Sequence, residues 1–381
     1  MTMGILQRDV VVAVVKTFAV ALGTLLVLMT LGGGVKEGIK EGLPVPLALQ
    51  TMPLLVPEML RFIVPGCLLF AVCNVFGRRA ADNEILAIKA SGINPLRLVW
   101  PVLVLSYLLS VGTYMLYDVC AAWSRPNLHR LLVNSIDEIA ISYLAVNRSY
   151  QKDDLSIVVK GMDGDTLLSP IIVFQPRNNE MRFTLVAQSA RLSFQDETGK
   201  LRFECHNGRL EVGDDAEVFF PGDFVHEVPV VEQRERGADK LSPAALRSSL
   251  VGSQIARERR LIDELASRPR AHAEPETIAA LERHRKRLYR LQAEVPRRIS
   301  NGFACLGFAI IGIPVAMWSR SADTMSVFFI CFLPILLVYY PLLIVGENIA
   351  RGGVLPSLSV WLADTVLFVA GAGLTYKFTR H

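Results

Sequence analysis

The chain has 381 residues, of which 51% are hydrophobic and 20% charged, and its mean hydropathy is +0.37. A soluble protein of this length is rarely so apolar, so the composition argues against that class and indicates an integral membrane protein. The formal net charge at pH 7 is only +4, and it is spread unevenly along the chain.

Three apolar segments in the first third of the chain are each long enough to cross a bilayer. They run from about residues 10–31, 54–76 and 96–117. Because the hydrocarbon core of a membrane requires about 20 apolar residues in a helix, we expect residues 1–118 to form three transmembrane helices.

A polar stretch, RRAADNEILAIKASGINPLR, separates the second and third spans at residues 78–97. We expect it to contain a short helix at about residues 80–92. Asp82 is the expected N-terminal cap, and Ser91-Gly92 followed by Asn94-Pro95 favours the end of this helix and the start of the next.

The residues of this polar helix divide into two faces on a helical wheel. Ile85 and Ile88 lie on an apolar stripe, whereas Asn83 and Ala87 lie on an opposite face of small residues, with Glu84 beside it. One carboxylate on a face of small residues suits docking into a groove of another protein. We therefore interpret the helix as a coupling element.

Residues 142–230 change to short alternating runs such as SIVVK, IIVFQ, RFTLVA, RLSFQ, KLRFEC and RLEV. Turn signals stand between the runs at Asp163-Gly164, Glu197-Thr198-Gly199 and Asn207-Gly208. This pattern is typical of an all-β sandwich or barrel, although it does not predict the strand order. We place the β domain at residues 125–231.

The region 238–298 contains the most charged part of the chain. Residues 232–298 hold 16 Lys and Arg against 10 Asp and Glu. Ser242-Pro243 favours a helix start, and Pro269 and Pro275 divide the region into two helices. We expect a charged helical hairpin that packs against the β domain and leads into span four; its basic face is an alternative site for lipid phosphates. Nucleic acid is a poor partner, because the basic run lies between membrane-associated segments.

Three further apolar segments, at about residues 301–318, 325–345 and 356–376, make residues 299–381 the second group of transmembrane helices. Six spans put both termini on one side. The short segments on that side hold Arg8, Arg78, Arg79, Lys89, Arg97, Arg320, Lys377 and Arg380. The opposite short loops hold only Lys36, Lys40 and Arg351, so the positive-inside rule places the termini and the polar helix in the cytoplasm and residues 118–298 outside. Arg297 and Arg298 beside span four conflict mildly with this topology.

The sequence contains no motif that carries catalytic chemistry. No P-loop, HExxH or GxSxG occurs, and the six cysteines show no metal-ligand spacing. Carboxylates such as Glu347 and Asp364 fall near the ends of spans, where an interfacial position costs less than burial. We therefore expect no catalytic residue, no metal site and no cofactor in this chain, which is expected to transport or sense rather than to act as an enzyme.

Three motifs give the chain a family resemblance. They are ADNEILAIKASGINPLRL at residues 81–98, LGFAIIGIPVAMWSRSADT at 306–324, and GENIARGGVLPSLSVWLADTVLFVAGAGL at 346–374. Together with the order of the spans, they resemble the lipopolysaccharide export permeases of the LptF/LptG (YjgP/YjgQ) family. The region 238–295 looks longer and more charged than is usual in that family.

The resemblance implies an α-helical membrane protein with six transmembrane helices and a periplasmic jellyroll-like β domain inserted between spans three and four. It implies a bacterial inner-membrane subunit that pairs with a second permease, with a cytoplasmic ABC ATPase dimer that holds ATP and Mg²⁺, and with a periplasmic jellyroll bridge protein. The substrate would be lipopolysaccharide or a similar glycolipid.

The resemblance also suggests roles for particular residues. Glu84 matches the family's acidic residue that enters the ATPase groove, and Asn83, Ala87 and Ile88 surround it. Lys36 and Lys40 are candidate contacts for lipid phosphates at the outer face. A membrane-anchored sensor or scaffold, and an ABC permease for another envelope lipid or a lipoprotein, remain alternatives, and the sequence does not distinguish an F-like from a G-like subunit or a homodimer.

Overall fold

The structure is a computed structural model in which the chain forms two compact units. The first comprises Met1–Met29, Leu55–Ser124 and Ser242–His381, and the second Thr30–Leu54 and Arg125–Leu241. The residues described are 4–30, 32, 45–134, 136–152, 155–164, 166–174, 183–195, 200–212, 216–229, 242–267, 275–319 and 323–380.

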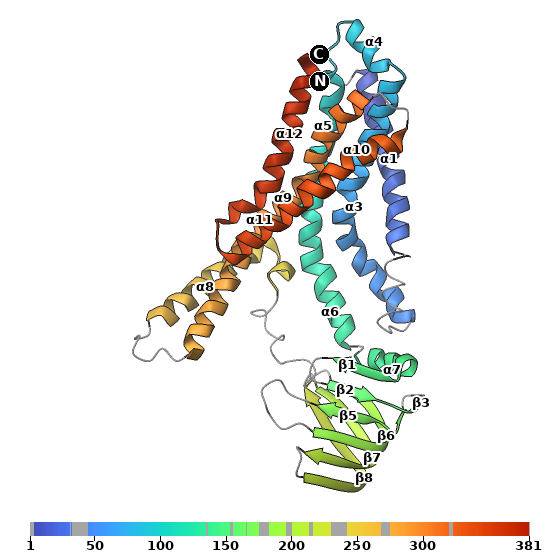
Figure 1. The fold of residues 1–381 in the computed structure, drawn as a ribbon, viewed down its shortest axis with the longest axis vertical. Helices are drawn as coiled ribbons and strands as arrows, with labels where there is room; N and C mark the ends of the chain where they lie inside the picture. Colours follow the sequence, from blue (N-terminus) through green and yellow to red (C-terminus); the bar gives the residue numbers. More distant parts are fainter. Residues whose placement is uncertain are drawn as a thin grey trace. The chain divides into compact units, whose positions relative to one another are not determined.

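Six helical stretches in these ranges are long and apolar enough to cross a membrane, as the sequence predicts. They comprise α1 (Ile5–Met29), α3 (Val45–Ala81), α5 (Leu96–Val119), α9 (Pro275–Ser319), the pair α10 (Thr324–Pro334) and α11 (Tyr340–Gly352), and α12 (Leu362–Arg380). The chain is therefore a multi-pass membrane protein. Figure 1 shows both termini at one end of the helices, beside the short helix α4 (Glu84–Ala90).

The core of the first unit lies where α3, α5, α9 and α12 pack together. Phe76, Val102 and Phe308 are buried at its centre. A Cβ on Gly307 of α9 would lie 2.1 Å from a methyl carbon of Leu367, so this glycine leaves room for the Leu367 side chain of α12 against α9. Small residues at crossing points are a common means of packing membrane helices.

Span five is interrupted by a π-helical segment, η7 (Ile335–Tyr339), between α10 and α11. Pro334 precedes the segment and Pro341 follows it, and proline supplies no backbone N–H for the regular helical ladder. At the start of the span, Asp323 caps α10 by accepting hydrogen bonds from two backbone N–H groups. The hydroxyl of Ser326 also donates to this carboxylate, which lowers the pKa of Asp323.

The second unit contains an antiparallel sheet and the helices α6 (Arg125–Asn134) and α7 (Ile136–Asn147). The strands are β1 (Ser149–Lys152), β2 (Leu155–Val158), β3 (Gly161–Asp163), β4 (Thr166–Leu168), β5 (Ile171–Phe174), β6 (Phe183–Gln195), β7 (Lys200–Val212) and β8 (Ala216–Pro229). Their order is β1-β2-β5-β6-β4-β3, with β7 paired to β6 and β8 paired to β7. The sheet lies between spans three and four in the chain and fits the jellyroll-like domain that the sequence predicts.

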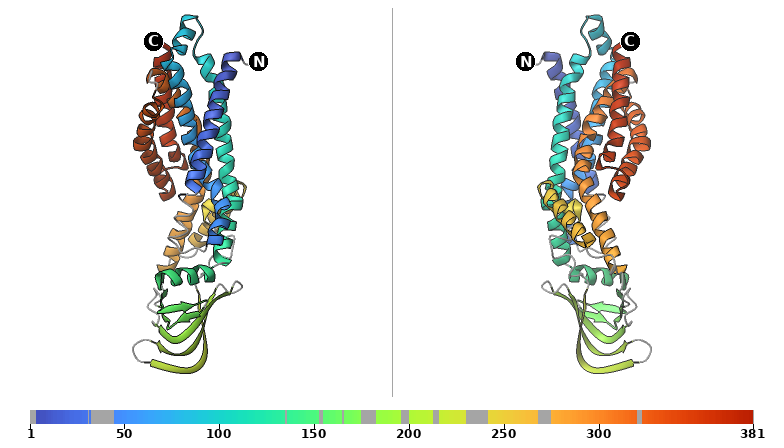
Figure 2. Two further views of the ribbon diagram at one scale, coloured as in Figure 1. Left: turned by 90° about the vertical axis from the view of Figure 1, so that its right-hand side faces the viewer. Right: turned by 90° about the vertical axis from the view of Figure 1, so that its left-hand side faces the viewer.

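Three pairs of predicted strands are continuous in the structure. The runs RFTLVA and RLSFQ form most of the single strand β6, and KLRFEC and RLEV form β7. Two further runs of the same pattern, EVFF and FVHEVPV, lie largely within β8. The turn expected at Asn207-Gly208 is wrong, because this dipeptide forms a bulge inside β7, where the register shifts between His206 and Gly208. The long strands bend strongly, as Figure 2 shows. The turn at Asp163-Gly164 joins β3 to β4 as predicted, whereas residues 197–199 lie outside the described ranges.

The charged region belongs to the first unit. Ser242-Pro243 begins only a short 3₁₀ turn, η5 (Pro243–Ala245), and the α-helix α8 (Ser248–Ser267) follows it. The second helix of the predicted hairpin does not end before span four. It is the first part of α9, which continues through Pro296 into the span.

Candidate functional site

The short helix α4, which the sequence predicts to be a coupling element, follows directly on α3. The residue at its N-cap position is Asn83 and not Asp82, so the expected cap at Asp82 is wrong. Asn83 has a left-handed backbone (φ 58°), and its side chain makes no capping hydrogen bond. A sharp left-handed turn suits asparagine better than most residues. The chain therefore changes direction between α3 and α4 through the backbone of Asn83, and no side-chain carboxylate caps the start of α4.

The end of α4 agrees with the prediction. Gly92 has φ 74°, and the N–H groups of Gly92 and Ile93 donate to the carbonyls of Lys89 and Ile88 at 3.0 and 3.2 Å. This is the paired bonding that closes a helix on glycine. The Asn94 side chain then accepts a hydrogen bond from the N–H of Leu96 at 2.9 Å and starts α5.

The two faces of α4 differ in burial. Ile85 joins the hydrophobic core, and Ile88 is partly buried against it. Asn83, Glu84 and Ala87 are exposed on the other side. Of the four predicted coupling residues, three therefore lie on a surface that a partner can reach, and Ile88 anchors the helix.

Arg79, at the end of α3, joins α4 to the first span. Its guanidinium lies 2.5 Å from the Asp9 carboxylate of α1 and 3.3 Å from the Glu84 carboxylate. A second contact joins the start of α1 to the same region, since Gln7 Nε2 donates to the Arg97 carbonyl at 2.7 Å. Helix α4 and the start of span one are thus held together by polar contacts.

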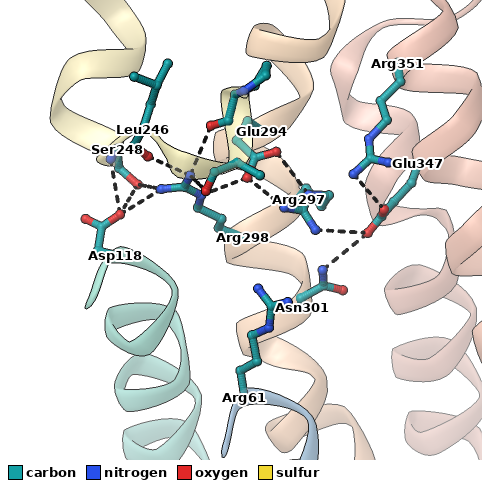
Figure 3. Close-up of polar contacts among 12 residues, drawn as sticks. Arg61, Asp118, Leu246, Ser248, Glu294, Arg297, Arg298, Asn301, Glu347 and Arg351 are labelled. Carbon is teal, nitrogen blue, oxygen red and sulfur yellow. Dashed lines mark hydrogen bonds and ion pairs between the residues drawn. The ribbon is translucent and has the colours of Figure 1, made fainter. Parts of the chain in front are cut away.

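A polar network centred on Arg298 lies toward the other end of the helices (Figure 3). The Arg298 side chain is 1% exposed, and its guanidinium donates to Glu294 at 3.0 Å and to Asp118 at 2.9 Å. It also donates to the Leu246 carbonyl at 2.7 Å. Asp118 in turn accepts hydrogen bonds from the hydroxyl and N–H of Ser248, at 2.6 and 3.2 Å, and so caps α8. The conflict of Arg298 with the positive-inside rule is explained, because the side chain is paired inside the protein.

The network continues from α9 to α11. Arg297 contacts Glu294 at 2.7 Å and Glu347 at 4.0 Å, and Asn301 donates to Glu347 at 3.3 Å. Arg351 completes the series with a 3.3 Å contact to Glu347. Ion pairs of this kind can hold helices in a fixed register where they leave the apolar part of a membrane.

A cavity of about 280 Å³ lies beside this network. Its lining residues are Arg61, Phe62, Pro65, Tyr117, Arg297, Asn301, Ala304, Tyr339, Tyr340, Leu343, Ile344 and Glu347. Arg61 pairs with Glu58 at 2.5 Å, but its buried Nε has no hydrogen-bond partner. Arg61 is not among the site residues predicted from the sequence, although an arginine inside the apolar run LLVPEMLRFIVP is by itself a candidate for a functional residue.

Asp364 is also buried, contrary to the interfacial position expected for it. It accepts hydrogen bonds from the Ser300 hydroxyl and, at 3.2 Å, from the Tyr339 hydroxyl. The carboxylate therefore joins α9, η7 and α12, because Tyr339 is the last residue of the π-helical segment.

The remaining predicted site residues, Lys36 and Lys40, lie outside the described residues. In the part of the chain that the structure describes, no group of three His, Cys, Asp or Glu is arranged to bind a metal.

Comparison with known proteins identifies the family of the chain. The family model described as lipopolysaccharide export system permease LptF/LptG matches residues 8–377. The search among curated proteins found no significant match. The family match extends over both groups of spans and the β domain between them, so the chain belongs to the LptF/LptG family of lipopolysaccharide export permeases.

Proposed function

We propose that the chain is the permease subunit of an ATP-driven exporter that extracts lipopolysaccharide, or a related glycolipid, from the inner membrane and passes it to a periplasmic bridge. The observation that carries this proposal is the geometry of α4. Its exposed side presents Asn83, Glu84 and Ala87 at the end of the bundle where both chain termini lie. This is the cytoplasmic end by the positive-inside rule.

Energy would enter through a separate ABC ATPase dimer that binds ATP and Mg²⁺. The chain's sequence has no P-loop, so a docked partner is needed to supply hydrolysis. Closure of that dimer would displace α4, and the contacts of Arg79 with Glu84 and Asp9 would pass the displacement to span one.

A second permease of the same family would cover spans one and five. In α1, Val10 and Val14 are the buried residues, while Val20 and Leu28 are 70% and 62% exposed. Leu337 in span five is 68% exposed. These apolar surfaces would face lipid or a partner helix, and opening the seam between them would admit acyl chains.

Phosphates of the lipid would need cations near the outer membrane surface. Lys36 and Lys40 remain our candidates, and the cavity that contains Arg61 and Arg297 adds two guanidinium groups. The unpartnered Nε of Arg61 supports this addition, because an anionic group would satisfy it.

The β domain would lie in the periplasm and receive the lipid. Its last strand, β8, is at the edge of the sheet and exposes Val218 and Phe219. An exposed apolar edge strand is a place where another sheet can add. This supports contact with the bridge protein.

Co-purification of the full chain from its native membrane, with mass spectrometry of proteins and lipids, tests the proposal. We expect an ABC ATPase, a second permease and a phosphorylated glycolipid. The alternatives give other results: a sensor or scaffold would lack the ATPase, and a permease for another cargo would carry a different lipid or a lipoprotein.

Replacement of Lys36 and Lys40 by Glu should weaken lipid crosslinking to span one, and unchanged crosslinking would remove these two lysines from the proposed phosphate contacts.

A further inference from the structure

The hairpin formed by α8 and the first part of α9 has a strongly basic surface that the proposed function does not use. Its exposed cations are Arg247, Arg257, Arg259, Arg260, Arg283, Arg285, Lys286 and Arg290. Within the described hairpin, the exposed acids from residue 247 to 290 are Asp263, Glu264 and Glu282. The excess of positive charge identifies a surface for an anionic partner.

Two of these cations, Lys286 and Arg290, line a groove of about 570 Å³. The groove runs between α9, the segment at residues 242–244 and the end of α11. Arg351 adds a third cation, and Glu294 is the groove's acidic residue. Glu294 is already paired with Arg297 and Arg298, so the groove has an excess of positive charge.

The partners of these cations decide which of them can bind a ligand. Arg351 contacts Glu347 at 3.3 Å. Lys286 and Arg290 form no ion pair with any residue that the structure describes. An ammonium and a guanidinium therefore border the same groove with their charge uncompensated by the described chain.

The walls of this groove are held in place by buried contacts. Arg298 fixes one wall, because it donates to the carbonyls of Pro243, Ala244 and Leu246 at 3.4, 3.3 and 2.7 Å. Beside the lining residue Gly352, Gly353 lies against the ring of Tyr289, which brings the end of α11 close to α9. A groove built in advance in this way loses little entropy when it binds a ligand.

The groove is at the edge of the membrane-spanning part of the chain. Asn348, Arg351 and Gly352, which line it, form the last turn of span five. The phosphate groups of bilayer lipids lie at the boundary of the hydrocarbon, where Lys and Arg bind them. We propose that this groove binds the phosphate of an anionic phospholipid headgroup from the surrounding membrane, with Lys286 and Arg290 as the primary contacts.

The test is lipid binding by the purified full chain in detergent, measured by native mass spectrometry with phosphatidylglycerol and phosphatidylcholine as probes. We expect wild type to retain phosphatidylglycerol preferentially. The double variant K286E/R290E should lose at least about tenfold in affinity, since each such cation is worth about 1 kcal/mol at a lipid surface. The neutral variant K286Q/R290Q should show a smaller loss in the same direction.

The matched control is R259E/R260E, which makes the same change in net charge on exposed residues of α8 outside the groove. We expect it to bind phosphatidylglycerol nearly as wild type does. An equal loss in both double variants would overturn the groove site in favour of diffuse surface charge. Displacement by millimolar inorganic phosphate, with no preference between the two lipids, would overturn the lipid assignment in favour of a free anion. The assay measures neither export nor ATPase docking, so it is independent of the proposed function.

Discussion

The Glu84 carboxylate of α4 lies 3.3 Å from the guanidinium of Arg79, which belongs to the same chain. The Glu84 side chain is 51% exposed, and an ion pair so close to water contributes only about 0–1 kcal/mol. Glu84 can therefore exchange Arg79 for a cation of a partner at small cost. Because Arg79 also contacts Asp9, this exchange of partners would change the contacts at the start of span one.

Charge reversal at Glu84 tests its role in coupling. We expect Glu84→Lys to lower the stimulation of the partner ATPase at least about tenfold, because a cation would meet a site that accepts an anion. Thermal stability should change little, since the side chain is half exposed. The measurements are ATPase activity of the reconstituted complex and apparent Tm.

Asp82 provides the matched control for this prediction, because it is an exposed carboxylate two positions earlier that does not cap the helix. Asp82→Lys should leave ATPase stimulation near the wild-type value. Equal losses in the two variants would point to a general need for negative charge, and full activity of Glu84→Lys would remove Glu84 from the coupling surface.

Removal of the Arg298 guanidinium should destabilise the first unit strongly. Arg298→Met removes the donor from the carbonyls of Pro243, Ala244 and Leu246 and leaves Glu294 with Arg297 as its remaining cation. Breaking a buried ion pair in this way costs about 3–5 kcal/mol. We expect a large fall in apparent Tm and in the yield of folded protein. Arg298→Lys should recover only part of the loss, because an ammonium cannot reproduce the planar fork of contacts.

Arg259→Met is the control for Arg298, since it removes the same group from an exposed position on α8. Its apparent Tm should lie close to that of wild type. A similar effect of the two substitutions would contradict the central place of Arg298 in the network.

Local patterns in the sequence predict most of the elements. Six long apolar runs give six helices, and Gly92 and Asn94 end one helix and start the next, because these signals act within a few residues. The buried and exposed faces of α4 are predictable for the same reason: Ile85 is buried and Glu84 exposed, as the helical period requires.

The network around Arg298 was not predictable, because its partners are distant in the chain. Arg298 contacts Asp118 and Leu246, and no local pattern joins these positions. The continuity of the β strands was also missed, because Asn207-Gly208 resembles a turn. In the structure the dipeptide forms a β-bulge inside β7, and the pairing of β7 with β6 and β8 continues on both sides of it.

Cysteine labelling tests the membrane topology. All six native cysteines are buried, and burial raises the pKa of the Cys205 thiol to about 12, so native thiols should react slowly. A single cysteine at Ala87 should react with a membrane-impermeant maleimide only after the cytoplasmic face is opened. A single cysteine at Ser253, exposed on α8, should react in intact spheroplasts. The reverse pattern would invert the topology and contradict the cytoplasmic position of α4.

Gly353 and its neighbour Gly352 form a matched pair for testing how the end of α11 is built. Gly353 has φ 74°, and a Cβ there would lie 2.3 Å from the Tyr289 ring, whereas a Cβ on Gly352 would meet nothing closer than 3.8 Å. We expect Gly353→Ala to lower the stability by at least about 1 kcal/mol through backbone strain alone, with more from the contact. Gly352 is the last residue of α11, and alanine has a higher helix propensity than glycine, so Gly352→Ala should be neutral or slightly stabilising. Thermal unfolding of the two variants side by side measures this difference, and equal apparent Tm values would show that α11 and α9 do not meet as closely as the Gly353–Tyr289 contact requires.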